Sequence, residues 1–267
     1  MNLQLENKVF LVSGGARGIG QAICKAIAAE GAIPVVIDPA ITEANALIAE
    51  LREAGQAALH LPLRLDTQDK CAQAVNTALE KLGRIDGIVN NAGRNDGAGL
   101  TEGSPEAFAR SIAENLFHCF DLVHYALPAL KETKGAIVNI ASKTAVTGQG
   151  GTSGYAAAKG ALLALTREWA VELLSHGIRV NAVVPAEVMT PAYENWLQTL
   201  QEPDETLTHI KARIPLGQRM TEPQEIASMV AFLLSARAGH TTGQHLFVDG
   251  GYVHLDRALG TILKSER

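Results

Sequence analysis

The chain has 267 residues, of which 47% are hydrophobic and 19% are charged, and its formal net charge at pH 7 is −5. This length and apolar content allow one large hydrophobic core, and no linker, repeat or low-complexity segment divides the chain, so we expect one domain over residues 1–267. The acidic balance gives no positive field for nucleic acid, and no apolar run reaches the ~18 residues that span a bilayer. Residues 1–7 lack the charged start and apolar block of a signal peptide, so we expect a cytoplasmic protein without membrane or nucleic-acid partners.

The first predicted element is a buried strand at residues 8–12, followed by the glycine-rich turn Ser-Gly-Gly-Ala-Arg-Gly-Ile-Gly and an Ala/Ile-rich helix. Glycines let the backbone approach a pyrophosphate, and the first helical N–H groups favour its negative charge. The spacing is G-x-x-x-G-x-G rather than G-x-G-x-x-G, and a lone turn of this kind also occurs as a tight connection. The candidate phosphate-binding residues are Gly14, Arg17, Gly18, Ile19 and Gly20.

The second predicted strand, residues 33–37, ends in Asp38. A carboxylate at this place can bind the adenosine ribose hydroxyls and repels a 2′-phosphate, which favours NAD over NADP. Arg17 in the glycine turn opposes this prediction because a guanidinium attracts phosphate. We give Asp38 more weight, since a partly buried charge opposed to a phosphate costs more than a loop arginine recovers. The alternative for Asp38 is a cap or turn residue ahead of Pro39.

Three further elements follow before the centre of the chain. A strand at residues 87–89 leads into Asn-Asn-Ala-Gly at residues 90–93, and Ser104 with Pro105 predicts the start of a helix that contains Asn115. An apolar strand at residues 135–141 then ends at Ser142.

The alanine-rich run after Gly154 predicts a helix on which Tyr155 and Lys159 share one face. A tyrosine hydroxyl titrates at about pH 10, and an ammonium beside it favours the phenolate. Ser142 can then hydrogen-bond a substrate oxygen while Tyr155 accepts its proton, or the same groups run in reverse can protonate a carbonyl. For the Y-x-x-x-K spacing alone, a solvated helical pair is the alternative.

In this order, the motifs resemble the short-chain dehydrogenase/reductase family over essentially the whole chain. The resemblance implies an α/β fold with a Rossmann-like, doubly wound parallel sheet of about seven strands, helices on both faces and a small lid. It implies oxidoreductase activity on CH–OH groups with a nicotinamide cofactor. The catalytic residues would be Asn115, Ser142, Tyr155 and Lys159, with Asn115 holding a water that connects the lysine to solvent.

The resemblance also implies the remaining cofactor contacts. Asp66 would contact the adenine ring, and residues 90–93 match an element that steadies the sheet beside the cofactor. Residues 179–185 match the sixth strand, which leads to the loop over the nicotinamide, although Ala186 stands where the family usually has glycine. Residues 186–240 would form a mobile substrate lid, in which Pro191, Pro203 and Pro215 suit a broken pair of helices. The further candidate cofactor residues are Asn91, Ala92, Gly93, Pro185, Val188 and Thr190, together with Tyr155 and Lys159.

The candidate substrate residues are nearly all polar: Asn95, Gln149, Glu187 and Trp196. An aromatic content of only 4% argues against a flat apolar ligand and favours a hydroxylated one, although Asn95 also suits a solvated loop. Residues 142–150, 185–191 and 254–259 resemble a bacterial branch of the family that includes L-fucose dehydrogenases. This implies NAD-dependent oxidation of an aldose at its anomeric hydroxyl to the lactone. Asp256 and Arg257 would approach a neighbouring subunit's site or form a surface ion pair.

Two other functions stay open, a reductase of the 3-oxoacyl carrier-protein type that uses NADPH and a non-catalytic nucleotide-binding relative. Asp38 argues against the first, and the complete catalytic set argues against the second. The family commonly forms dimers or tetramers through the helices that hold Asn115 and Tyr155, so a homo-oligomer is expected. The three cysteines suit buried thiols, and the histidines lack metal-ligand spacing, so no metal is expected in the chemistry.

Overall fold

The computed structural model describes residues 1–256, so Arg257 of the predicted tail pair lies outside the described residues. Seven strands form one parallel sheet in the order β3-β2-β1-β4-β5-β6-β7, which confirms the expected doubly wound architecture. The strands are β1 Val9–Ser13, β2 Ile33–Ile37, β3 Leu59–Leu61, β4 Gly87–Asn90, β5 Ala136–Ile140, β6 Arg179–Pro185 and β7 His245–Val248.

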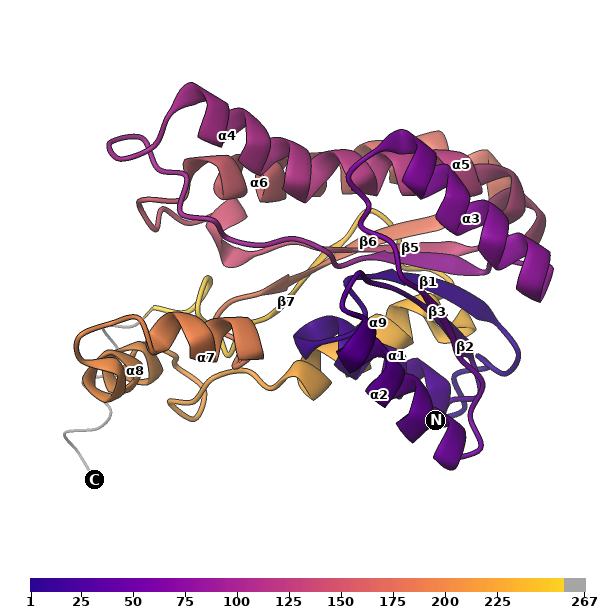
Figure 1. Cartoon of the computed structure of the whole chain (residues 1–267), viewed down its shortest axis with the longest axis horizontal. Coiled ribbons are helices and arrows are strands. Elements are labelled where there is room, and N and C mark those ends of the chain that lie inside the picture. The colour runs from indigo at the N-terminus through magenta and orange to yellow at the C-terminus, as the bar shows by residue number, and fades with distance from the viewer. Residues whose placement is uncertain (257–267) are drawn as a thin grey trace.

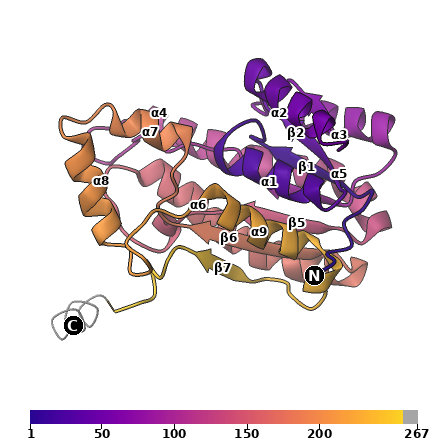
Figure 2. The same ribbon diagram turned by 90° about the horizontal axis from the view of Figure 1, so that it is seen from below.

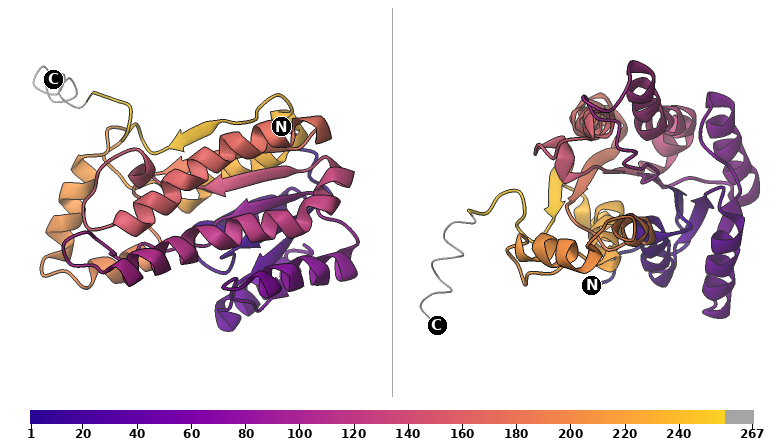
Figure 3. Two further views of the ribbon diagram at one scale, coloured as in Figure 1. Left: turned by 90° about the horizontal axis from the view of Figure 1, so that it is seen from above. Right: turned by 60° about the vertical axis from the view of Figure 1, so that its left-hand side comes forward.

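Helices cover both faces of the sheet (Figure 1). One face carries α1 Gly18–Ala29, α2 Ile41–Glu53 and α9 Pro223–Leu234. The opposite face carries α3 Gln68–Leu82, α4 Pro105–Ile112, α5 His118–Thr133 and α6 Ser153–Glu172. Figure 3 shows the long helices of this second face running across the sheet from one end to the other.

Strand β1 shows why the sheet is covered on both sides. All five of its residues are buried, as expected of a parallel strand between two helical layers. Successive side chains of a strand point to opposite faces. Phe10 and Val12 accordingly join one hydrophobic cluster, with α1 and α9, whereas Val9 and Leu11 join the other, with α3 and α5.

The predicted lid is shorter in the structure than residues 186–240. Helices α7 Pro191–Leu197 and α8 Pro203–Ala212 each begin with proline, which suits the first helical turn, and lie beyond the carboxyl ends of the strands (Figure 2). Helix α9 lies inside the predicted range but packs against α1, and its Ile226 is fully buried in the core. Residues 223–234 therefore pack in the core of the fold.

The order of strands reverses at β1 and β4, because the chain first adds β2 and β3 on one side and then β4 to β7 on the other. In open α/β sheets, ligands bind outside the carboxyl ends of the strands at such a switch point. The glycine-rich turn follows β1 and the Asn-Asn-Ala-Gly loop follows β4. The topology therefore brings these two motifs together.

Candidate active site

The turn after β1 has the shape that a pyrophosphate cradle requires. Gly14 has a φ of +65°, and a Cβ at Gly20 would overlap the Gly14 carbonyl oxygen. Helix α1 begins at Gly18, and the preceding Arg17 side chain makes no capping hydrogen bond. The first N–H groups of α1 therefore have no side-chain acceptor and can bind an anion. This geometry fits a dinucleotide phosphate bound by Gly14, Gly18, Ile19 and Gly20.

Asp38 is buried at the carboxyl end of β2. Its Oδ2 accepts a hydrogen bond from Ala16 N–H at 3.1 Å, and its Oδ1 accepts one from Ala40 N–H at 2.9 Å. The turn role that the sequence left open is thus present, and the same carboxylate also lies against the glycine turn. Arg17 forms an ion pair with Glu43 at 3.3 Å, so a carboxylate already engages this guanidinium.

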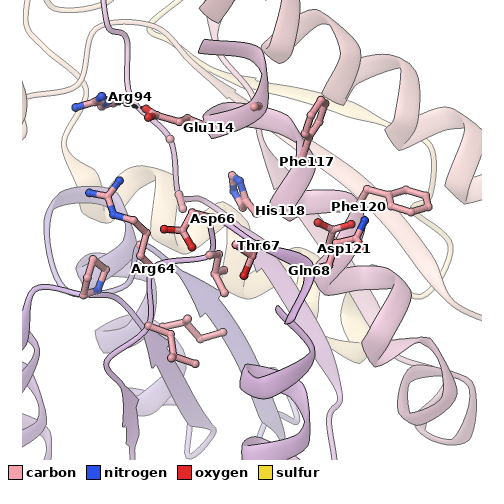
Figure 4. A pocket seen from close by; sticks show the side chains of 18 residues that line it. Arg64, Asp66, Thr67, Gln68, Arg94, Glu114, Phe117, His118, Phe120 and Asp121 are labelled. Atoms are coloured by element: carbon pink, nitrogen blue, oxygen red, sulfur yellow. Dashed lines mark hydrogen bonds and ion pairs between the residues drawn. The ribbon is translucent and has the colours of Figure 1, made fainter. Parts of the chain in front are cut away.

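A cavity of about 550 Å³ opens beside Gly14 (Figure 4). Asp66 lies on one wall, where Lys70 donates to its Oδ1 at 2.8 Å, and His118 points in from the opposite wall. Burial, with a contribution from the Lys159 charge, lowers the pKa of His118 to about 4, so the ring is neutral. The cavity suits the adenosine half of a dinucleotide. The sequence analysis missed His118, because a lone histidine in a helix carries no spacing signal.

The loop after β4 is tied to the glycine turn by hydrogen bonds. Asn91 Nδ2 donates to the carbonyl oxygens of Ser13 and Gly14, both at 3.0 Å. The Ser13 hydroxyl oxygen accepts from the N–H groups of Asn91 and Ala92, also at 3.0 Å. Ala92 and Gly93 line the cavity, and Asn91 fixes their loop against the glycine turn.

Asn115 lies in a π-helical turn, Ala113–Phe117, that interrupts the helix between α4 and α5. The Ser104 hydroxyl caps the start of this helix, as predicted. Asn115 is fully buried, its Oδ1 accepts from Arg94 N–H at 2.8 Å, and its Nδ2 donates to the Ser111 carbonyl at 2.8 Å. Single π turns within helices occur frequently at functional sites.

Ser142, Tyr155 and Lys159 come together where β5 ends and α6 begins. Lys159 Nζ donates to the last carbonyl of β5 at 2.8 Å and lies 5.7 Å from the centroid of the Tyr155 ring. A Cβ built on Gly93 would lie 2.7 Å from Asn115 Oδ1 and 3.4 Å from Lys159 Nζ, which places these two side chains around one glycine. The structure therefore gathers all four predicted catalytic residues.

The pKa of Tyr155 moves in the opposite direction to the one expected from its spacing to Lys159. Burial raises the pKa of Tyr155, and the hydrogen bond with Ser142 lowers it less than burial raises it. Burial also lowers the pKa of Lys159. The expected lowering of this pKa is not present in the chain by itself, because desolvation of the phenolate outweighs the hydrogen bond with Ser142.

The loop after β6 closes over the glycine turn. Pro185 ends β6, Val188 forms an isolated bridge with Thr221, and the Thr190 side chain caps α7. A Cβ built on Gly18 would lie 3.3 Å from the Thr190 side chain. The three predicted cofactor residues of this loop therefore lie between the carboxyl end of β6, where Pro185 stands, and the glycine turn, which Thr190 contacts.

The predicted substrate residues differ in their surroundings. Asn95 is exposed, and its Oδ1 accepts from Gly97 N–H at 3.2 Å, which matches the solvated-turn alternative. Gln149 is exposed, and Trp196 is 45% exposed with its ring edge-on to Tyr193 at 5.1 Å.

Glu187, the fourth of these residues, is largely buried. It forms an ion pair with Lys143, and its Oε2 accepts from the Tyr193 hydroxyl at 2.9 Å. The sequence analysis did not single out Lys143 as a site residue, although it directly follows Ser142.

Residues 1–256 contain no helix that is long and apolar enough to cross a membrane. Within the same residues, no group of three or more His, Cys, Asp or Glu side chains could hold a metal ion. Cys24, Cys71 and Cys119 are buried free thiols, as predicted, and burial raises the pKa of Cys71 and Cys119 to about 12.

Fold and site together define an oxidoreductase that uses a nicotinamide dinucleotide. Residues 14–253 match a family model described as enoyl-(acyl carrier protein) reductase. The chain belongs to the short-chain dehydrogenase/reductase family, whose members bind NAD(P) and act on CH–OH groups of small molecules.

Named relatives cover nearly the whole chain. It is 36% identical to meso-2,3-butanediol dehydrogenase of Serratia marcescens, over 93% of this chain and 96% of that protein. It is 34% identical to 3-oxoacyl-[acyl-carrier-protein] reductase of Thermotoga maritima, over 94% and 100%. It is 35% identical to L-fucose dehydrogenase of Mus musculus, over 91% and 88%. The crystal structure of Cj0485 dehydrogenase superposes with a TM-score of 0.92 at 44% identity, covering 97% of this chain and 98% of that one.

Proposed function

We propose that this enzyme uses NAD to oxidise a hydroxylated small molecule, with an aldose such as L-fucose, converted at its anomeric hydroxyl to the lactone, as the first candidate. The observation that carries the substrate class is the buried ion pair of Lys143 and Glu187 beside Ser142. Charged groups at a binding surface favour hydroxyl groups, which can hydrogen-bond to them, over an acyl chain, which cannot. The names of the Serratia marcescens and Mus musculus relatives both specify hydroxylated substrates.

The preference for NAD is supported by Asp38. Asp38 is only 7% exposed, and its carboxylate accepts from two backbone N–H groups, so it cannot readily move away from a 2′-phosphate. Such a phosphate would oppose a fixed negative charge in a site with little water, which is costly. Arg17, the one cation of the glycine turn, is already paired with Glu43.

The proposed roles of the site residues follow from their hydrogen bonds. The Ser142 hydroxyl oxygen accepts from the Thr144 N–H at 3.3 Å and from the Thr144 hydroxyl at 3.1 Å, so its own hydrogen is left to donate to Tyr155 or to a substrate oxygen. Tyr155 accepts the proton of the substrate hydroxyl, and Lys159 lies beside its ring to stabilise the phenolate. Asn115 would hold the water that passes this proton on to solvent. When bound, the oxidised nicotinamide supplies the acceptor for the hydride that leaves the same carbon.

A second candidate is reduction of a 3-oxoacyl group with NADPH. The 34% identity to the Thermotoga maritima reductase over its full length supports this candidate. The position of Asp38 argues against it. A non-catalytic role is the third candidate, and the gathered set of Asn115, Ser142, Tyr155 and Lys159 argues against that.

The proposed organisation is one domain over residues 1–267 that assembles into a homo-oligomer. Exposed aromatic side chains on α4, the π turn and α5 support a contact with a second copy at these helices, since large exposed apolar side chains are common at interaction sites. They are Phe108, Phe117 and Phe120.

A substrate screen tests the proposal. Purified protein is assayed with L-fucose, other aldoses, polyols and simple alcohols, each with NAD or NADP, by the absorbance of the reduced cofactor. We expect turnover of at least one aldose or polyol and a preference for NAD. Turnover of acyl thioesters alone, with NADPH, would reject the aldose and establish the second candidate.

A further inference from the structure

Two opposite charges lie buried beside the catalytic serine. The Lys143 side chain is 9% exposed and the Glu187 side chain 13% exposed, and the two form an ion pair. Lys143 stands in the turn after β5, directly after Ser142, and Glu187 stands in the loop after β6. Because β5 and β6 are neighbours in the sheet, this pair lies at the same sheet edge as the catalytic residues.

Two tyrosines complete the group, which we call the Lys143–Glu187 clamp. The Tyr193 hydroxyl donates to Glu187 Oε2 at 2.9 Å, and Lys143 Nζ lies 4.2 Å from the centroid of the Tyr252 ring. Burial, followed by the charge of Glu187 and this hydrogen bond, raises the pKa of Tyr193, so its hydroxyl stays protonated and remains a donor. The clamp therefore joins the turn after β5, the loop after β6, the first lid helix α7 and the segment after β7.

Stability alone does not explain a buried pair of this kind. Removing an ammonium and a carboxylate from water costs several kcal/mol per ion, and apolar residues of similar volume often serve a fold equally well. Lys143 begins a 3-10 turn and Glu187 stands in a loop, so neither residue lies in a strand of the sheet.

The clamp has hydrogen-bonding capacity left over. An ammonium has three N–H donors, of which Glu187 takes one and the Tyr252 ring faces another. A carboxylate has about four acceptor positions, of which Lys143 and Tyr193 use two. A ligand group that both accepts and donates would satisfy both residues. A hydroxyl group has this property, whereas a carbonyl or thioester oxygen can only accept.

We infer that Lys143 and Glu187 bind a second hydroxyl of the substrate, on the carbon next to the one that is oxidised, and so select vicinal diols and sugars over simple alcohols. This inference rests on the proposed oxidation of a hydroxylated substrate. The position of Lys143 next to Ser142 in the chain supports the neighbouring carbon, because Ser142 is proposed to bind the reacting oxygen itself. In an aldose oxidised at its anomeric carbon, this second group is the 2-hydroxyl.

The test compares two pairs of substrates, each differing in one hydroxyl group: L-fucose with 2-deoxy-L-fucose, and meso-2,3-butanediol with 2-butanol. In the unaltered enzyme we expect kcat/KM to favour the hydroxylated member by about 10- to 100-fold, the range for hydrogen bonds to charged groups. In Lys143→Met/Glu187→Gln, which removes both charges together, we expect the ratio to fall to within about 3-fold, because the rate on the hydroxylated member of each pair falls more than the rate on the other member.

Three controls distinguish a change in substrate selectivity from a loss of folded structure. Lys25→Met removes an exposed ion pair with Glu50 on the far helices and should leave both ratios unchanged. Glu187→Gln alone keeps an acceptor for Tyr193 and covers the case in which the double variant does not fold. The melting temperature and the Kd for NAD report whether each variant is intact.

The outcomes distinguish this inference from the proposed function. Equal rates on both members of each pair in the unaltered enzyme would overturn the inference, and so would a ratio that the variants leave unchanged. Oxidation of L-fucose and its 2-deoxy analogue at equal rates would retain the sugar substrate and overturn the clamp. A diol preference that depends on Glu187, without turnover of any aldose, would retain the clamp and reject the sugar. Turnover of acyl thioesters alone would overturn both.

Discussion

Replacement of Asp38 by alanine should reverse much of the preference for NAD. The change removes a buried carboxylate that lies against the glycine turn and accepts from Ala16 and Ala40 N–H groups. We expect kcat/KM with NAD to fall and that with NADP to rise. A ribose hydroxyl bound to a charged group contributes about 2 kcal/mol, and relief of repulsion with a 2′-phosphate adds about 1 kcal/mol or more. Together these shift the ratio of the two kcat/KM values by about 100-fold.

The alanine variant has a second effect that must be separated from the first. Ala16 is fully buried, so its N–H loses its acceptor when the carboxylate is removed, and an unsatisfied buried donor costs about 1–3 kcal/mol. Asp38→Asn is the matched variant, because an amide oxygen can still accept from this N–H group while the charge is gone. We expect the asparagine variant to keep a higher melting temperature than the alanine variant.

The assay is steady-state kinetics with each cofactor at a fixed concentration of the best substrate. A shift toward NADP in both variants would support recognition of the ribose by the charge. An unchanged NAD-to-NADP ratio in Asp38→Asn, with normal stability, would place the carboxylate outside the ribose site and refute the reasoning. A loss of both activities only in Asp38→Ala would indicate that the residue acts through the glycine turn alone.

Three further outcomes are expected. Tyr155→Phe should lower turnover by about 10²- to 10⁴-fold with the Kd for the cofactor unchanged, because the proton acceptor is lost; retention of most activity would contradict the role. Since burial raises the pKa of Tyr155, kcat/KM for alcohol oxidation should rise with pH in the alkaline range, and kcat/KM for carbonyl reduction should fall. A flat pH profile would contradict this role of Tyr155. The hydrogen bond from Arg219 is the main cause that lowers the pKa of Glu225 to about 2. The ionised Glu225 therefore stabilises the fold above its ordinary pKa of 4.5, and this contribution is lost as the pH falls toward 2. Arg219→Met should return the Glu225 pKa toward 4.5 in an NMR titration, and an unchanged value would show that the ion pair is absent in solution.

The fold could be predicted from sequence because most of the strands that shape the site are buried on both faces. Such strands are near-continuous apolar runs, and the predicted run at residues 33–37 coincides with β2. The extent of the lid could not be predicted in the same way. Helix α9 lacks strand character just as α7 and α8 do, and only its packing against α1 shows that it belongs to the core. Local pattern thus identified the elements but not the surface against which each one packs.

The candidate site was predicted where one motif contains the chemistry. Ser142, Tyr155 and Lys159 lie within 18 residues of sequence, and their types and spacing indicate proton transfer. The pKa of Tyr155 could not be predicted, because spacing along a helix shows which residue is near but not how much water surrounds it. Lys143 and Glu187 are 44 residues apart, and the pairing of β5 with β6 brings them together.

The clamp and the catalytic serine share one turn, and this has a consequence for how selectivity would act. A substrate hydroxyl held by Lys143 and Glu187 would fix the neighbouring carbon relative to Ser142 and Tyr155, because the backbone between Ser142 and Lys143 is a single peptide bond. Binding energy from a non-reacting group would then be used to orient the reacting one, which affects turnover as well as affinity. For substrates that lack the second hydroxyl, the proposed geometry therefore implies a lower kcat and not only a higher KM.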